Sequence, residues 1–131
     1  MLVERRKFRR ANIKYPINVI CTGEVVQGDP QSYIFHTYTE NMGKGGIMVM
    51  LEKEVSPGSL VELELFITDK ESLPIKCNGV IIWNKRANPE GTKPNLFSTG
   101  IQFKDLTNPA YCKLLDEVIN SHLDNKSEDK G

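Results

Sequence analysis

The residues best able to do chemistry in this chain are cations gathered near its start. Five of the six residues from 5 to 10 are basic: Arg5, Arg6, Lys7, Arg9 and Arg10. Neighbouring guanidinium groups repel one another and are costly to desolvate, so they must face water or an anion. The chain as a whole is neutral, and without this hexapeptide its remaining 12 basic residues face 17 acidic ones. The cluster therefore indicates either a solvated basic terminus or a site for an anionic ligand.

A glycine cluster is the second candidate. The segment from Asn41 to Gly46 reads Asn-Met-Gly-Lys-Gly-Gly, with three glycines at Gly43, Gly45 and Gly46. A turn that needs positive φ would be satisfied by one glycine. Three of them beside an asparagine leave bare backbone amides, which suit the close approach of a phosphate or of the polar edge of a base. We interpret the segment as a polar ledge between two strands.

Catalytic and metal-binding patterns are not found in the sequence. His36 falls within a predicted strand and His122 on the apolar face of a predicted helix, where a histidine is more often a core or rim residue than a base. Glu62 and Glu64 share one face of a predicted strand, which we interpret as the solvated face. The dispersed cysteines and histidines do not have the spacing of a tetrahedral metal site. The sequence therefore predicts no enzyme, no metal and no cofactor.

Length and composition indicate one ordinary globular domain. The chain has 131 residues, 39% of them hydrophobic and 26% charged, which is enough apolar material to close a modest core. No apolar run approaches the roughly 20 residues of a membrane span. Residues 4–7 are charged where a signal peptide would be apolar. The odd number of widely spaced cysteines (Cys21, Cys77 and Cys112) predicts reduced thiols. We expect a cytoplasmic protein that does not insert into a membrane.

Alternation of apolar and polar residues predicts a mainly β fold. Six strands are expected at about 13–26, 32–39, 47–51, 60–67, 74–83 and 97–103. The polar stretch 84–96 predicts a hairpin connection. Six short antiparallel strands at this chain length favour a small closed barrel, because closure removes exposed strand edges.

The last element changes period. Apolar residues recur at helical spacing from Tyr111 to Leu123, Thr107 or Asn108 is the expected cap, and Pro109 suits the first helical position. We therefore expect a six-stranded antiparallel β-barrel with a C-terminal α-helix. The predicted single domain covers 1–123, with a flexible basic arm over 1–14 and a disordered polar tail over 124–131.

Together, the two motifs resemble those of the PilZ domain, the bacterial receptor module for the second messenger cyclic di-GMP. The segment from Arg6 to Arg10 has the spacing Arg-x-x-x-Arg, and the segment from Asn41 to Gly46 has the spacing (Asp/Asn)-x-(Ser/small)-x-x-Gly. The flanking segments are similar too: Tyr15-Pro-Ile17, Gly79-Val-Ile-Ile-Trp83 and Thr99-Gly-Ile-Gln-Phe-Lys-Asp-Leu106. Either motif alone is weak, whereas both in this order, on this pattern of elements, are specific. The resemblance spans residues 4 to about 123.

The resemblance implies that a flexible arginine arm closes over a ligand held on the outer surface of the barrel. Arg6 and Arg10 would be the motif arginines, with Arg5 and Arg9 as supporting contacts to phosphate or base. Independently of the family, arginine suits a ligand made of guanine and phosphate. Its planar fork can bind guanine O6 and N7, pair with phosphate, or stack on a base.

On the barrel, the resemblance implies four ligand-binding residues. Asn41 would accept a hydrogen bond from guanine, Gly46 would allow close approach, and Trp83 would either stack on the ligand or fill the barrel wall. Gly43 departs from the family pattern, which most often has serine there. Because the lost hydroxyl contact is worth about 1 kcal/mol, and Asn41 lacks the charge of aspartate, we expect weaker binding than in a consensus member.

Three hypotheses for function follow. The first is a cyclic di-GMP receptor that orders its arm on binding and signals to an unidentified partner protein. The second is a divergent adaptor that acts by protein–protein contact without the ligand. The third, a barrel for single-stranded nucleic acid, conflicts with the absence of a broadly basic composition. We therefore expect no DNA or RNA partner.

Overall fold

The computed structural model describes residues 10–21, 33–68 and 73–129, with Arg10 and residues 123–129 as backbone only. In these residues the elements in chain order are β1 (Arg10–Ala11), β2 (Pro16–Cys21), β3 (Tyr33–Gly43), β4 (Gly46–Leu51), β5 (Leu60–Leu65), β6 (Ile75–Arg86), β7 (Phe97–Lys104) and α1 (Pro109–Asp129).

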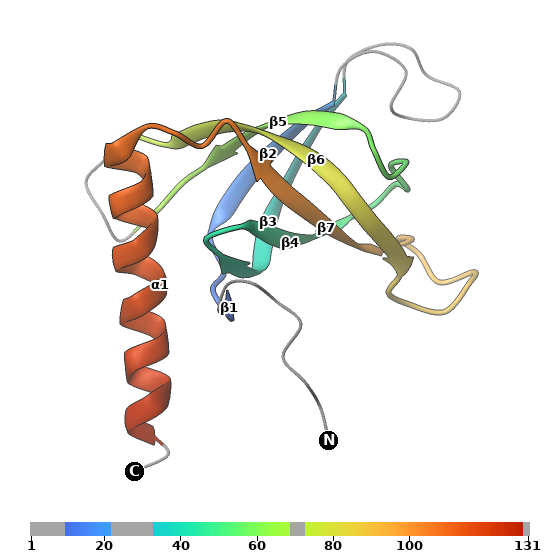
Figure 1. The fold of residues 1–131 in the computed structure, drawn as a ribbon. Helices are drawn as coiled ribbons and strands as arrows, with labels where there is room; N and C mark the ends of the chain where they lie inside the picture. Colours follow the sequence, from blue (N-terminus) through green and yellow to red (C-terminus); the bar gives the residue numbers. More distant parts are fainter. Residues whose placement is uncertain (1–9, 22–32, 69–72, 130–131) are drawn as a thin grey trace, which may run out of the picture.

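The strands form a closed antiparallel barrel (Figure 1). Their order is β1-β3-β2-β5-β6-β7-β4, and the additional pairing of β3 with β4 closes the ring from β2 to β7. The short β1 pairs with the end of β3, on the edge of β3 that β2 also uses. The predicted six-stranded antiparallel barrel with one C-terminal helix is confirmed.

The barrel interior is filled by every second residue of its strands. In β2, for example, Ile17, Val19 and Cys21 are buried, whereas the residues between them are partly exposed. The register of β2 and β5 sets Ile17 opposite Leu65 and Val19 opposite Leu63, so the inward side chains meet in rows. Each buried aliphatic side chain of this kind contributes about 1.5–3 kcal/mol of transfer free energy.

The observed strands differ from the predicted ones where bulges occur. β3 continues past residue 39 to Gly43, through a register shift between Thr39 and Asn41. β6 continues past Trp83, through a shift between Ile81 and Trp83. A bulge inserts one residue and interrupts the alternation of side chains, so a simple period-two pattern ends there although the strand goes on.

The N-terminal strand is interrupted rather than continuous. β1 and β2 both pair with β3 and are separated by residues 12–15, and residues 22–26 of the predicted strand lie outside the described part of the chain. Ala11 and Ile13, which belong to the segment predicted as a flexible arm, are buried with 4% and 2% of their surface exposed. The packed part of the chain therefore includes Ala11, while residues 1–9 are not described.

Helix α1 stands beside the end of the barrel that carries β1 (Figure 1). Asn108 is its cap, because the Asn108 Oδ1 atom accepts a hydrogen bond from the Ala110 backbone N–H at 2.9 Å. Leu115, Val118 and Ile119 bury one face of the helix in the core. The helical backbone continues to Asp129, into the segment 124–131 that was expected to be a polar tail.

The cysteines are free thiols in different environments. Cys21 is buried, whereas Cys77 and Cys112 are half-buried. Burial raises the pKa of Cys21 and of Cys77 to about 11, and the Asp105 carboxylate adds to the rise in the pKa of Cys77. These two thiols are therefore protonated and poorly nucleophilic near neutral pH. The described part of the chain contains no helix that is long and apolar enough to cross a membrane.

Candidate functional site

The glycine cluster lies at the hairpin between β3 and β4. Here Asn41 pairs with Met48 and Met42 pairs with Ile47. Thr39 and Met42 are fully buried, whereas Asn41 is partly exposed. In a regular strand, Thr39 and Asn41 would face the same side, since side chains alternate. The bulge at Glu40 therefore directs the Asn41 side chain to the outer surface.

Asn41 begins a row of outward residues that crosses four strands. Asn41 on β3 pairs with Met48 on β4, Met48 pairs with Gly100 on β7, and Gly100 pairs with Trp83 on β6. Met48 lies between the fully buried Ile47 and Val49, so its own side chain faces outward. The Asn41 amide Nδ2 lies 3.8 Å from the Met48 sulfur. We call Asn41, Met48, Gly100 and Trp83 the outer row.

Trp83 lies across the outer surface at the end of this row. The second bulge, at Ile82, puts Trp83 opposite Gly100. A Cβ atom on Gly100 would lie 2.3 Å from the Trp83 Nε1 atom, so the indole occupies the space that a side chain there would need. With 42% of its surface exposed, the ring is accessible from solvent. Trp83 therefore does not fill the barrel interior, and its location is compatible with stacking.

Gly100 should hold this indole in place. In Gly100→Ala, the new methyl group cannot share the space with the indole, and an exposed side chain can move away at modest cost. We expect a red-shifted fluorescence emission from Trp83, which is the only tryptophan in the chain, with a loss of roughly 1 kcal/mol in the free energy of unfolding. Ser98→Ala, at the neighbouring outward position of β7, is the matched control and should leave the spectrum unchanged. An unaltered spectrum in Gly100→Ala would contradict the placement of the ring.

Gly46 and Gly43 serve the sheet in this structure. A Cβ atom on Gly46 would lie 2.2 Å from the carbonyl oxygen of Ile101, so the bare backbone of Gly46 makes room for β7. Gly43 is buried and stands opposite Arg10 in the pairing of β3 with β1. The space beside Gly46 is therefore already taken by β7, and the backbone of Gly43 is already paired with β1.

The structure places the predicted site residues as follows. Arg10, Gly43 and Gly46 lie at the hairpin end of β3 and β4, where Asn41 also lies, and Trp83 lies at the other end of the outer row. Arg5, Arg6 and Arg9 lie outside the described residues, and the side chain of Arg10 is not described. The described chain thus begins at Arg10, directly beside the ledge.

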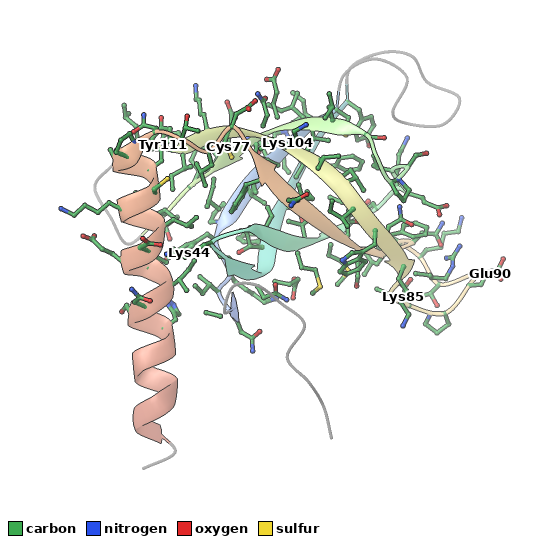
Figure 2. The ribbon with its side chains drawn as sticks, in the orientation of Figure 1. Lys44, Cys77, Lys85, Glu90, Lys104 and Tyr111 are labelled. Atoms are coloured by element: carbon green, nitrogen blue, oxygen red, sulfur yellow. The ribbon has the colours of Figure 1, made fainter. Side chains whose placement is uncertain are left out.

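Charged groups surround the ledge. Lys44, at the tip of the hairpin, faces α1, and its Nζ atom lies 3.4 Å from the Asp116 Oδ1 atom (Figure 2). Lys14 lies 3.4 Å from Glu40, the bulge residue. Both pairs are largely exposed, so each contributes little to stability. Each pair places an acidic group beside a lysine next to the ledge.

Sequence reasoning missed Met48 and Gly100. Gly100 could have been found, since a glycine inside a predicted strand often marks a close approach of another group. Met48 gave no signal, because residues 47–51 are all apolar and their hydrophobicity does not distinguish the outward positions from the buried ones.

Comparisons with known proteins agree with this architecture. The family model of the PilZ domain matches residues 4–121. Three similar solved structures are the PilZ domain of YcgR from Escherichia coli with c-di-GMP (16% identity, TM-score 0.62), the inhibitor of motility MotI/DgrA from Bacillus subtilis (16%, 0.70) and the MrkH–c-di-GMP complex from K. pneumonia (14%, 0.64). No curated protein matches the chain.

The extent of these matches differs. The alignments cover 97%, 95% and 99% of this chain, and 98%, 53% and 57% of the respective structures. The chain therefore spans the whole YcgR domain but about half of MotI and of MrkH. At these identities the structures show a shared fold, whereas the family model covers nearly the entire chain. By that match, the chain belongs to the PilZ domain family.

Proposed function

We propose that the protein is a cytoplasmic receptor for cyclic di-GMP, not an enzyme. The observation that carries the proposal is the entry of the basic segment at Arg10, opposite Gly43, beside the outer row that begins at Asn41. This arrangement offers cations, an amide and an aromatic ring to one ligand. The solved structures of the YcgR domain and of MrkH with c-di-GMP support the same ligand class.

Each part of the proposed site matches one part of the ligand. The Asn41 side-chain oxygen accepts from the N1–H or the amino group of one guanine, and the indole of Trp83 offers a stacking surface to a base. Arg6 and Arg10 engage phosphate and the guanine O6/N7 edge, with Arg5 and Arg9 in support. The Met48 side chain, between Asn41 and Trp83, forms an apolar floor.

The signal leaves through the basic arm. Without an anion, the charges of the arm repel one another and nothing offsets the entropy of ordering it. The two phosphates of the ligand neutralise these charges and hold the arm against the ledge. An ordered arm is a new surface, which a partner protein recognises.

Isothermal titration calorimetry with cyclic di-GMP, GTP, cyclic AMP and a short single-stranded oligonucleotide tests the function. Of these four titrants, we expect only cyclic di-GMP to give saturable heat. We also expect it to change the amide NMR signals of Asn41 and Gly43. Equal heats from all three nucleotides would remove the guanine-dinucleotide claim, and tight salt-dependent binding of the oligonucleotide would favour a nucleic-acid receptor.

A second candidate rests on Gly43. Because this residue has no hydroxyl and its backbone already faces Arg10 of β1, the site has one contact fewer than the family pattern. An adaptor that binds a partner without the ligand would show no heat with millimolar cyclic di-GMP.

A further inference from the structure

Thr39 is a polar residue in a position where the fold otherwise places apolar ones. Among the described residues, Thr39 and Thr99 are the polar residues that the core buries completely, with 0% of their surfaces exposed. A buried hydroxyl is unfavourable unless it is hydrogen-bonded. The partners of these two hydroxyls therefore indicate what each one does.

The Thr39 hydroxyl joins β3 to the segment that links β1 and β2. It donates to the Ile13 carbonyl oxygen at 2.5 Å and accepts from the Tyr15 backbone N–H at 2.9 Å. The Thr39 backbone N–H also donates to the Tyr15 carbonyl oxygen at 2.9 Å. In contrast, among the described residues the partner of the Thr99 hydroxyl is the Phe97 carbonyl oxygen of its own strand, at 3.2 Å.

These bonds lie where two irregularities of the sheet face each other. On one side, β1 and β2 are interrupted at residues 12–15. On the other side, β3 bulges between Thr39 and Asn41. The ladder is interrupted here but not lost. The Thr39 backbone N–H still bonds to the Tyr15 carbonyl oxygen, whereas the Tyr15 N–H and the Ile13 carbonyl oxygen both bond to the Thr39 hydroxyl.

Thr39 therefore adjoins both parts of the candidate site, which are the segment that leads to Arg10 and the bulge that leads to Asn41. On the chain before it, Ile13 leads back through Ala11 to Arg10, from which the basic segment departs. On the chain after it, the bulge turns Asn41 outward. The pairing of Arg10 with Gly43 depends on the path that residues 12–15 take past Thr39.

We propose that Thr39 is a positioning residue: its hydroxyl sets the point from which the basic arm leaves the barrel, relative to Asn41. The effect on cyclic di-GMP binding rests on the proposed function. The effect of the Thr39 hydroxyl on the position of β1 can be measured in the protein without ligand. Without these hydrogen bonds, the arm would leave the barrel from more than one position. Ordering it on binding would then cost more entropy, and the affinity would be lower.

The test compares Thr39→Val, which keeps the shape and removes the hydroxyl, with Thr39→Ser, which keeps the hydroxyl. Thr99→Val is the matched control, because it removes an equally buried hydroxyl that ties no second segment. The full chain is titrated with cyclic di-GMP by calorimetry, well below each unfolding midpoint. Amide exchange at Tyr15 and the amide signals of Ala11 and Gly43 are recorded without ligand. Thr39→Ala replaces the valine variant if the latter does not fold.

We expect Thr39→Val to bind roughly tenfold more weakly, with faster exchange at Tyr15 and shifted signals at Ala11 and Gly43. Thr39→Ser and Thr99→Val should bind within about twofold of wild type. Equal affinity of Thr39→Val and wild type, or equal weakening in Thr99→Val, would overturn the proposal. If wild type binds no cyclic di-GMP, the proposed function fails by itself. The positioning role of Thr39 then stands if the amide signals of Ala11 and Gly43 shift in Thr39→Val, and it falls if they do not shift.

Discussion

Replacing Arg6 and Arg10 together by alanine is expected to weaken the binding of cyclic di-GMP by at least about a hundredfold. A hydrogen bond to a charged group contributes about 1.5–3 kcal/mol, so the loss of two such contacts reaches that factor at its lower end. Calorimetric titration of the double variant beside wild type measures it. The stability of the barrel should be unchanged, because the basic segment precedes the packed core that begins with Ala11.

Two further variants separate charge from geometry in this experiment. Exchanging Arg6 and Arg10 for lysine keeps both charges and removes the planar fork, so an intermediate loss of roughly tenfold is expected. Lys7→Ala removes one charge from the same segment without touching the motif, and should change affinity by no more than about threefold. Wild-type affinity in the double alanine variant would exclude the arm from the site.

The sequence was sufficient to predict the barrel because its strands alternate so regularly. Within the strand predicted at 60–67, for example, Val61, Leu63 and Leu65 alternate with Glu62 and Glu64, and β5 covers Leu60–Leu65 of it. The helix was predictable for a similar reason, since Asn108 and Pro109 mark its start. What alternation could not show was continuation through a bulge, because the inserted residue exchanges the two faces of the strand.

The candidate site depends on those bulges, which explains why it was only partly predictable. The motif spacing pointed to Asn41, but its outward orientation requires the extra residue at Glu40. Likewise, the location of Trp83 on the outer surface requires the extra residue at Ile82 and the bare backbone of Gly100. A bulge is a property of two paired strands, so no pattern within either strand reveals it. The family resemblance identified the candidate residues, whereas the pairing of the strands determines where their side chains lie.

Gly46 was found from the motif, but its contacts are set by strand pairing. Its replacement by alanine is expected to cause a large loss of stability. In Gly46→Ala, we expect the free energy of unfolding to fall by about 3 kcal/mol. The new methyl group would lie 2.2 Å from the Ile101 carbonyl oxygen. That oxygen belongs to the backbone of β7, which pairs with β4 on one side and β6 on the other and cannot move independently. Urea denaturation monitored by circular dichroism measures the change.

Gly100→Ala is the control for Gly46→Ala, because the obstacle there is the movable side chain of Trp83 and not backbone. We expect Gly46→Ala to lose clearly more stability, while its folded fraction binds cyclic di-GMP within a few-fold of wild type, as a glycine needed by the sheet would imply. The opposite result, a variant as stable as wild type that no longer binds, would assign Gly46 to the close approach of the ligand. The two roles of a motif glycine, packing and recognition, are thereby distinguished by one substitution and two measurements.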